Sequence, residues 1–569
     1  MAARKDDVHP FLAVAAPVVL LLPLIDKPFH MDDTVYLWVA QHLHSAPFDF
    51  YGFTANWSFF EEPMAQINKN PPGVSYFIAA AAALFGWSEQ ALHAAFLLPA
   101  LAVAWGTYLL ARRFTARPGI AALAATLSPV FVVSSTNVMS DTLTLAFYVW
   151  AVYWWVEGIE TNSRARLSGA AVFMALATLT KYLGITSLPL LFAYAIAQKR
   201  GIGSWAVHFA IPILIIGAYQ WYCWRMYGVN PLANAAGFAS SFTAEAGAER
   251  PSYLSRFMIG LTFLGGCHTT ITLMAFALWP RRWTVPILIL AFAGACILFL
   301  AFRQASSAIV HPDYGMSMPM RVQCILFAAA GIHLLFCALY HLYRERDAGA
   351  LLIFLWIAGM FVFSSFVNWT TNGRTMLPMA PAVGILAARM IPPRAKSAAL
   401  PVSVPIGLVA SACLALLVAW SDYAMASAGK RAGEDLAKVR ESLGADVWVQ
   451  GNWGMRWYLE GAGAKPFDRD NGPRIGDVVI QSSNNLIYPL PEELRTLERE
   501  PIFPVFPWLA TMDRRLGAAF YAAIWGPLPY SFGRVPPETF YYWRMMPRAD
   551  AIESGPDQNS PTMSAPRPR

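Results

Sequence analysis

Long apolar segments separated by short polar loops occupy most of the chain up to residue 421. A membrane-spanning helix needs about 20 mainly apolar residues. The pattern therefore predicts about thirteen membrane helices, at residues 11–25, 90–111, 118–136, 140–158, 168–180, 183–198, 204–226, 254–279, 284–302, 322–342, 349–367, 374–391 and 401–421. Segments 168–180 and 183–198 are short for a membrane, and we expect them to form a broken helical pair.

The composition agrees with this pattern. The 569 residues are 56% hydrophobic and only 14% charged, whereas soluble proteins carry about 25% charged residues. The sequence therefore predicts an α-helical polytopic membrane protein. The formal net charge of +7 is explained by Lys and Arg beside the membrane segments, and no basic, aromatic-rich face predicts nucleic-acid binding.

Charged residues in alternate loops predict the orientation. Arg112, Arg113 and Arg117 lie in one loop of the expected cytoplasmic side, and the alternate loops carry few cations. Because cytoplasmic loops are enriched in Lys and Arg, the N-terminus is predicted in the cytoplasm. Loop 26–88 and the region after residue 422 then lie outside. We expect a multi-pass protein of a bacterial inner membrane.

Three regions are predicted along the chain. Residues 1–422 form a membrane domain, 423–550 a small extracytoplasmic α/β domain, and 551–569 a Pro/Ser-rich disordered tail. The elements expected in the second region are strands at 446–450 and 477–482 and helices at 431–444 and 455–460.

Two adjacent carboxylates, Asp32 and Asp33, open an amphipathic helix in loop 26–88. Val35 and Tyr36 share a helical face with Asp32. One interpretation is structural, because Asp commonly caps a helix N-terminus and is favoured there by the backbone dipole. The other is chemical: a carboxylate within hydrogen-bond reach of an acceptor hydroxyl or amine can act as general base.

Three cations are candidates for binding a phosphate. Lys69 precedes a helix expected to start at Pro71 or Pro72, and a helix N-terminus attracts anions. Arg374 stands at the outer start of a predicted span, where a guanidinium either anchors the interface or binds phosphate through two hydrogen bonds. Lys181 lies between two apolar segments, a costly place unless it snorkels or pairs with a carboxylate or phosphate.

An acid also stands at the outer start of predicted span 140–158. Asp141 follows Ser140 and Asn137 in the turn SSTNVMSD. A helix cap explains it, but an ionisable group this close to the bilayer is also a candidate site residue. No pattern establishes a cofactor, and a divalent metal is left as an open alternative.

Five stretches occur in a characteristic order: HMDDTVY, NKNPPGVSYF, SSTNVMSDTLTLAFYVW, ALATLTKYLGITSLPLLFAY and NGRTMLPMAPAVGILAA. Residues 10–395 thereby resemble the polyprenyl-phosphate-sugar-dependent glycosyltransferases of the C-type membrane superfamily. The bacterial relatives of dolichyl-phosphate-mannose protein mannosyltransferases and the lipid A aminoarabinose transferases are the most similar. The resemblance implies the C-type architecture and an inverting transfer on the outer membrane face. The donor would be a hexose or pentose on polyprenyl phosphate, and the acceptor a glycan, lipid or protein.

The resemblance also assigns roles. It implies that Asp32 is the catalytic acid, with Asp33 beside it. It implies that a Lys before Pro-Pro contacts the donor phosphate, although here Asn70 separates Lys69 from the prolines. The residues expected to bind donor phosphate are Lys69, Arg374 and Lys181. Those expected to line the substrate cavity are Tyr36, Asn137 and Asp141.

Two other classes stay open. A transporter or lipid-linked-sugar flippase often contains broken helices, and the pair around Lys181 favours that alternative. The candidate groups, however, gather at one membrane face instead of the midplane. A membrane-anchored binding or assembly protein, with residues 423–569 as its working part, is the third class.

Overall fold

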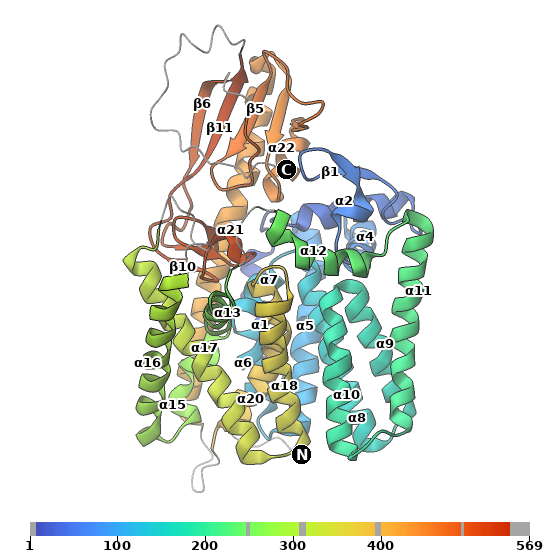
Figure 1. Ribbon diagram of the computed structural model, residues 1–569, viewed down its shortest axis with the longest axis vertical. Helices are drawn as coiled ribbons and strands as arrows, with labels where there is room; N and C mark the ends of the chain where they lie inside the picture. The colour runs from blue at the N-terminus through green and yellow to red at the C-terminus, as the bar shows by residue number, and fades with distance from the viewer. Residues whose placement is uncertain (1–6, 246–250, 306–314, 393–399, 491–493, 547–569) are drawn as a thin grey trace.

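The computed structural model describes residues 7–245, 251–305, 315–392, 400–490 and 494–546. The predicted disordered tail, 551–569, lies outside them. A bundle of upright helices carries a region with a β-sheet at one end, and the N-terminus lies at the other end (Figure 1).

The helices of the first half are α1 (Pro10–Leu21), α2 (Asp33–Ser45), α3 (Met64–Ile67), α4 (Gly73–Phe85), α5 (Glu89–Phe114), α6 (Pro118–Thr126), α7 (Pro129–Ser135), α8 (Ser140–Thr161), α9 (Arg164–Thr180), α10 (Ser187–Lys199), α11 (Ala210–Tyr227) and α12 (Pro231–Glu245). Those of the second half are α13 (Tyr253–Cys267), α14 (Thr269–Leu273), α15 (Ala275–Leu278), α16 (Arg281–Ala305), α17 (Met318–Glu345), α18 (Ala348–Val362), α19 (Gly373–Met376), α20 (Ala380–Met390), α21 (Ser403–Leu443) and α22 (Gly454–Gly461). Short turns of helix are η1 (Leu22–Leu24), η2 (Tyr182–Thr186), η3 (Ser204–Phe209), η5 (Phe363–Val367), η6 (Leu377–Met379) and η7 (Ala523–Trp525). The strands are β1 (Thr54–Asn56), β2 (Glu61–Pro63), β3 (Val447–Gln450), β4 (Lys465–Pro466), β5 (Val478–Ser482), β6 (Leu494–Ile502), β7 (Leu509–Ala510), β8 (Met512–Asp513), β9 (Ala518–Ala519), β10 (Ser531–Phe532) and β11 (Glu538–Met545).

Within the described ranges, six helical stretches are long and apolar enough to cross a membrane, or seven if the bent pair α6–α7 is one span. They are Glu89–Phe114, Ser204–Tyr227, Arg281–Ala301, Met318–Glu345, Ala348–Val367 and Ser403–Leu443. The chain is a multi-pass membrane protein, as predicted, but the count of about thirteen spans is not confirmed. Several predicted spans fold as short or broken helices: 254–279, for example, is divided into α13, α14 and α15.

Two breaks have local causes in the sequence. Helices α6 and α7 meet at 64°, where Pro129 disfavours helical backbone for the residue before it. Between α9 and α10 the backbone of Lys181 is extended. Gly184 then returns so close to α9 that a Cβ atom would stand 2.4 Å from the carbonyl carbon of Ala177. Helices α9 and α10 are therefore separated at Lys181, but the predicted broken pair is not confirmed. Lys199 at the end of α10 donates to Asn162 just before α9, so the two helices run antiparallel as a hairpin.

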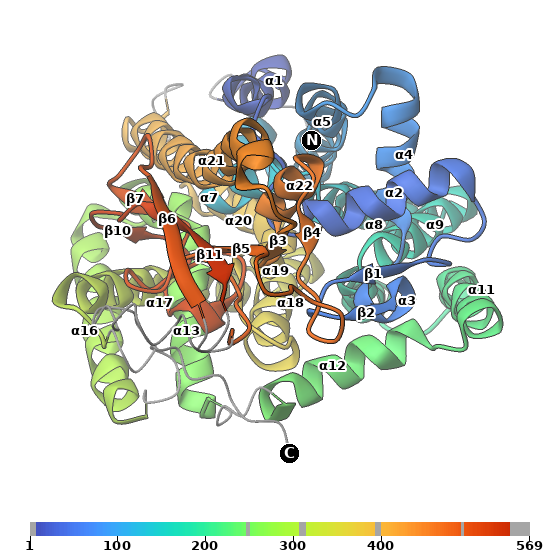
Figure 2. The same ribbon diagram turned by 90° about the horizontal axis from the view of Figure 1, so that it is seen from above.

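The helices α2, α4 and α12 lie at the sheet-bearing end of the bundle (Figures 1 and 2). Helix α4 starts at Gly73, directly after the predicted Pro-Pro start. Helix α2 packs against α4, and in Figure 2 α12 crosses the same end of the molecule near α3 and α11. These elements bring the predicted outer loop and the following helices together over the bundle.

The C-terminal region contains a five-stranded sheet of order β4-β3-β5-β11-β6. Strand β3 runs parallel to β4 and β5, and β11 runs antiparallel to β5 and β6. The strands predicted at 446–450 and 477–482 are present as β3 and β5. The helix predicted at 431–444 is instead the end of the 41-residue helix α21, which crosses the predicted boundary at 422/423.

The later part of this region folds back onto the helical bundle. The Ser421 hydroxyl donates to the Leu509 carbonyl at 2.5 Å, and the Tyr530 hydroxyl donates to the Gly266 carbonyl at 3.1 Å. We call residues 518–525, which contain β9 and η7, the β9–η7 segment. A self-contained α/β domain at 423–550 stays a prediction, because part of this region packs against the membrane helices.

Candidate functional site

A cavity of about 400 Å³ opens between α2, the chain before α4, η2, α12 and the segment from η5 to α19. Five of the predicted site residues line it: Asp32, Tyr36, Lys69, Lys181 and Arg374. These residues come from parts of the chain more than 300 positions apart. The structure therefore brings the predicted acid and the three predicted cations to one cavity.

Asp32 and Arg374 form the central contact of the cavity wall. Arg374 Nη1 donates to Asp32 Oδ2 at 2.9 Å, and the carboxylate is 34% exposed. Asp32 occupies the N-cap position of α2, but its side chain makes no cap hydrogen bond. Met31 before it has a φ of 46°, a conformation that costs energy for a residue other than glycine. The backbone is thus held in a strained turn that leaves this carboxylate free of a capping role.

Arg374 follows the side-chain cap of a short helix. The side-chain oxygen of Asn372 accepts a hydrogen bond from the Thr375 N–H and so caps the N-terminus of α19. The guanidinium is 12% exposed and lies over the ring of Tyr521, with Cζ 5.5 Å from the ring centroid. Among the described residues its Nε has no hydrogen-bond partner. A mostly buried guanidinium with an unused donor is suited to bind an anion.

Lys181 pairs with a carboxylate, that of Asp141; a carboxylate or a phosphate was the partner expected for it. Lys181 Nζ donates to Asp141 Oδ1 at 2.6 Å, and both side chains are largely buried. Lys181 lines the cavity, whereas Asp141 stands behind it and does not.

Lys69 and Tyr36 line the cavity from its outer side. Lys69 Nζ donates to the Gln66 carbonyl at 2.5 Å and to Asn234 Oδ1 on α12 at 3.3 Å. The Tyr36 hydroxyl accepts from Asn70 Nδ2 at 3.4 Å. Asn70, the residue that departs from the family pattern, therefore connects the loop of Lys69 to α2.

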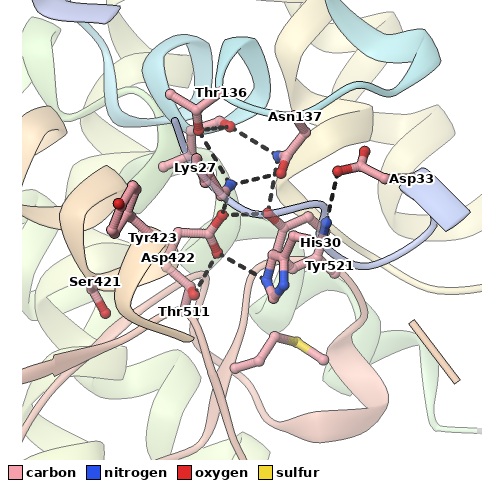
Figure 3. A network of polar contacts seen from close by, with 12 residues as sticks. Lys27, His30, Asp33, Thr136, Asn137, Ser421, Asp422, Tyr423, Thr511 and Tyr521 are labelled. Atoms are coloured by element: carbon pink, nitrogen blue, oxygen red, sulfur yellow. Dashed lines mark hydrogen bonds and ion pairs between the residues drawn. The ribbon is translucent and has the colours of Figure 1, made fainter. Parts of the chain in front are cut away.

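Besides Asp141, two more predicted site residues do not line the cavity. Asp33 is fully buried, and its Oδ2 accepts from the His30 N–H at 2.7 Å. Asn137 is also buried, with Oδ1 accepting from Lys27 Nζ at 2.7 Å. Both lie in the polar cluster drawn in Figure 3. Their predicted roles in chemistry stay predictions.

A buried ion pair forms the centre of that cluster. Lys27 Nζ contacts Asp422 Oδ2 at 2.6 Å, and neither side chain is exposed. Asp422 also accepts from the hydroxyls of Thr511 at 2.7 Å and Tyr521 at 2.6 Å, and His30 Nε2 lies 3.6 Å from it. The cluster joins the start of the first outer loop to α21 and to the C-terminal region (Figure 3).

Sequence reasoning did not single out Lys27 or Asp422. A signal was present, because each charge lies within two residues of a predicted apolar span and such groups usually have a partner. Nothing in the sequence paired these two, which are 395 positions apart. Across the described ranges, no three His, Cys, Asp or Glu side chains gather in an arrangement that could hold a metal ion.

Burial raises the pKa of Asp33 to about 7. Because the folded protein holds this proton more tightly than the unfolded chain, the stabilisation is complete below about pH 4 and lost as the pH rises through about 7. We expect the wild type to lose stability over this range faster than Asp33→Asn, by up to about 1.4 kcal/mol per pH unit. The amide keeps an oxygen for the His30 N–H. Unfolding measured from pH 4 to 8 checks this, and parallel curves for the two proteins would contradict it.

Comparison with known proteins gives a family match over part of the chain. Residues 69–224 match the family model described as dolichyl-phosphate-mannose-protein mannosyltransferase. No curated protein sequence matches the chain.

Several solved structures are similar. ArnT from Cupriavidus metallidurans, bound to undecaprenyl phosphate, is 15% identical with a TM-score of 0.39 over 83% of this chain and 92% of ArnT. The oligosaccharyltransferase AglB from Archaeoglobus fulgidus, in complex with an inhibitory peptide and a dolichol-phosphate, is 12% identical with a TM-score of 0.45 over 83% and 69%. Arabinofuranosyltransferase AftD from Mycobacteria is 15% identical with a TM-score of 0.40 over 96% and 40%. The match of residues 69–224 confirms the predicted resemblance to the C-type membrane glycosyltransferases.

Proposed function

We propose that this chain is a membrane glycosyltransferase that moves a hexose or pentose from a polyprenyl-phosphate-linked donor to a glycan, lipid or protein acceptor. The observation that carries the proposal is the contact of Asp32 with Arg374 in a cavity that Lys69 and Lys181 also line. One partly exposed carboxylate among three cations suits the reaction of a nucleophile with a phosphate ester. The family match of residues 69–224 supports the class of donor.

The reaction is a single displacement with Asp32 as general base. The acceptor hydroxyl or amine attacks the anomeric carbon from the side opposite the phosphate. As the new bond forms, the bond between the anomeric carbon and the phosphate oxygen breaks, and its electron pair leaves with the phosphate. The acceptor proton passes to the Asp32 carboxylate. Attack from the opposite side inverts the anomeric configuration.

The three cations stabilise the leaving group. The departing polyprenyl phosphate carries more negative charge than the sugar-linked diester, so positive groups placed beforehand lower the barrier. A donor phosphate at Arg374 competes with Asp32 for the guanidinium and so frees the carboxylate to accept a proton. Lys181 remains oriented by Asp141. Asp33, Tyr36 and Asn137 have supporting roles in this scheme, holding the turn and the cavity wall around Asp32.

The proposal has the cavity outside the cytoplasm, in a bacterial inner membrane, with the N-terminus inside. The described chain begins at the end of the bundle opposite α2 and the sheet, where Asp7 Oδ2 accepts from the Gly119 N–H of α6 at 3.0 Å. At that opposite end Arg113 pairs with Glu160, and Lys199 donates to Asn162. Since cytoplasmic ends are rich in Lys and Arg, this arrangement supports an outer cavity. About thirteen membrane crossings, counting short and broken helices, belong to the same proposal.

The proposal is tested with membranes that contain the protein and undecaprenyl-phosphate-linked mannose, glucose or aminoarabinose, each labelled in the sugar. A labelled product with a new glycosidic bond, absent from membranes lacking the protein, is the expected result. A flippase is the second candidate, and the short helices α9 and α10 around Lys181 are the feature that favours it. Movement of the labelled lipid across the bilayer without a new glycosidic bond would overturn the transferase in favour of that candidate.

A further inference from the structure

The β9–η7 segment of the C-terminal region lies against the loop that carries Arg374. The Gly373 N–H donates to the Phe520 carbonyl at 2.7 Å, and the Ala523 N–H donates to the Thr371 carbonyl at 2.9 Å. The fit is close, because a Cβ atom at Gly373 would stand 2.6 Å from Cε2 of Phe520. Two backbone hydrogen bonds thus attach this loop to a part of the chain about 150 residues away.

Tyr521 connects the β9–η7 segment to the guanidinium itself. Its ring centroid lies 5.5 Å from Arg374 Cζ, within the range in which an aromatic face attracts a cation. Its hydroxyl donates to Asp422 Oδ2 at 2.6 Å and accepts from Asn137 Nδ2 at 3.0 Å (Figure 3). The side chain is buried. The two hydrogen bonds of the hydroxyl therefore fix the orientation of the ring beside the Arg374 guanidinium.

The ring is the main support for Arg374 on this side. Arg374 Nη1 contacts Asp32 Oδ2 and the sulfur of Met139. The Nε donor makes no hydrogen bond within the described part of the chain. An arginine side chain has many rotamers, so a rigid ring beside the guanidinium restricts where it can point.

We propose that Tyr521 is a positioning residue, through which the C-terminal region holds Arg374 against Asp32 in the cavity wall. Asp422 and Asn137 hold the Tyr521 hydroxyl, and the Tyr521 ring orients Arg374. The kinetic consequence rests on the proposed function, whereas the placement of Arg374 does not. The candidate site is then incomplete without the C-terminal region.

The test compares Tyr521→Leu, which removes the ring, with Tyr521→Phe, which keeps it. Tyr530→Leu is the matched control, because Tyr530 is equally buried in the same region but its hydroxyl contacts Gly266. Two quantities are measured on monodisperse protein: the KM for the labelled donor, and the rate at which phenylglyoxal modifies Arg374, followed by peptide mass spectrometry. Tyr521→Met replaces the leucine variant if that variant does not fold.

Tyr521→Leu is expected to raise the donor KM by about tenfold and to speed modification of Arg374. Tyr521→Phe keeps the ring but loses the hydrogen bonds that hold it, so it is expected to change both values less than Tyr521→Leu and to unfold at a lower temperature than the wild type. Tyr530→Leu lowers stability and changes neither value. Wild-type KM and wild-type Arg374 reactivity in Tyr521→Leu would overturn the proposal, as would equal changes in Tyr530→Leu. If the wild type transfers no sugar, the proposed function fails, and the Arg374 modification rates still decide the positioning role.

Discussion

Asp32→Asn is expected to lower kcat for sugar transfer by about 10²- to 10⁴-fold, the usual contribution of a general base. The amide has nearly the same shape and keeps an oxygen for Arg374 Nη1, so the fold should change little. Because a neutral amide competes less with the donor phosphate for the guanidinium, the donor KM should not rise. What it loses is the ability to take the acceptor proton. Initial rates at saturating labelled donor measure the effect, and thermal unfolding shows whether the variant remains folded.

The matched control is Asp49→Asn. Asp49 belongs to the same outer loop and accepts from the Tyr227 hydroxyl at 2.9 Å, but it does not line the cavity. We expect it to retain wild-type kcat. Asp32→Glu should recover part of the rate, because a carboxylate returns in a shifted position. A wild-type kcat in Asp32→Asn would remove Asp32 from the role of base.

The largest loss of stability is expected from breaking the buried pair Lys27–Asp422. Lys27→Met or Asp422→Asn leaves one buried partner without its counter-charge, and such changes typically cost about 3–5 kcal/mol. Neither side chain is exposed, and Asp422 also binds Thr511 and Tyr521. The loss should appear as a lower unfolding midpoint of each purified variant in detergent.

A double variant shows whether the loss of stability comes from leaving one buried charge unpaired. Lys27→Met combined with Asp422→Leu removes both charges, so we expect a loss smaller than the sum of the two single variants. Lys465→Met removes the exposed pair with Asp446 and should leave the midpoint unchanged, because exposed pairs contribute little. Additive losses in the double variant would show that Lys27 and Asp422 stabilise the fold independently of each other.

Features that depend on neighbouring residues could be predicted from the sequence. Apolar segments and Lys/Arg-rich loops indicated a multi-pass membrane protein, because partition into a bilayer depends on composition over about 20 residues. The separation of two helices at Lys181 was also predicted, since a lysine divides the apolar segments, but their arrangement as an antiparallel hairpin was not. Strands β3 and β5 followed from their local pattern.

The residues at which helices begin and end were harder to predict. The 41 residues of α21 join a predicted span to a separately predicted helix, because nothing local ends the helix between them. Gly429 and Gly433 would ordinarily weaken a helix, but here they allow α22 to pack closely: a Cβ at Gly429 would stand 2.9 Å from Met455 Cα. Packing against another element therefore continues a helix that local propensity would interrupt.

The sequence by itself determined which chemical groups this protein offers: an acid pair, three cations near apolar segments, and the order in which they occur. Only the tertiary structure decided which of them meet. Asp32 and Asp33 are neighbours, yet one lines the cavity and the other is buried against His30, because successive helical residues face different directions. The contacts of Asp32 with Arg374 and of Lys27 with Asp422 span 342 and 395 positions. Pairing at such separation depends on the packing of whole helices, which no local pattern in the sequence specifies.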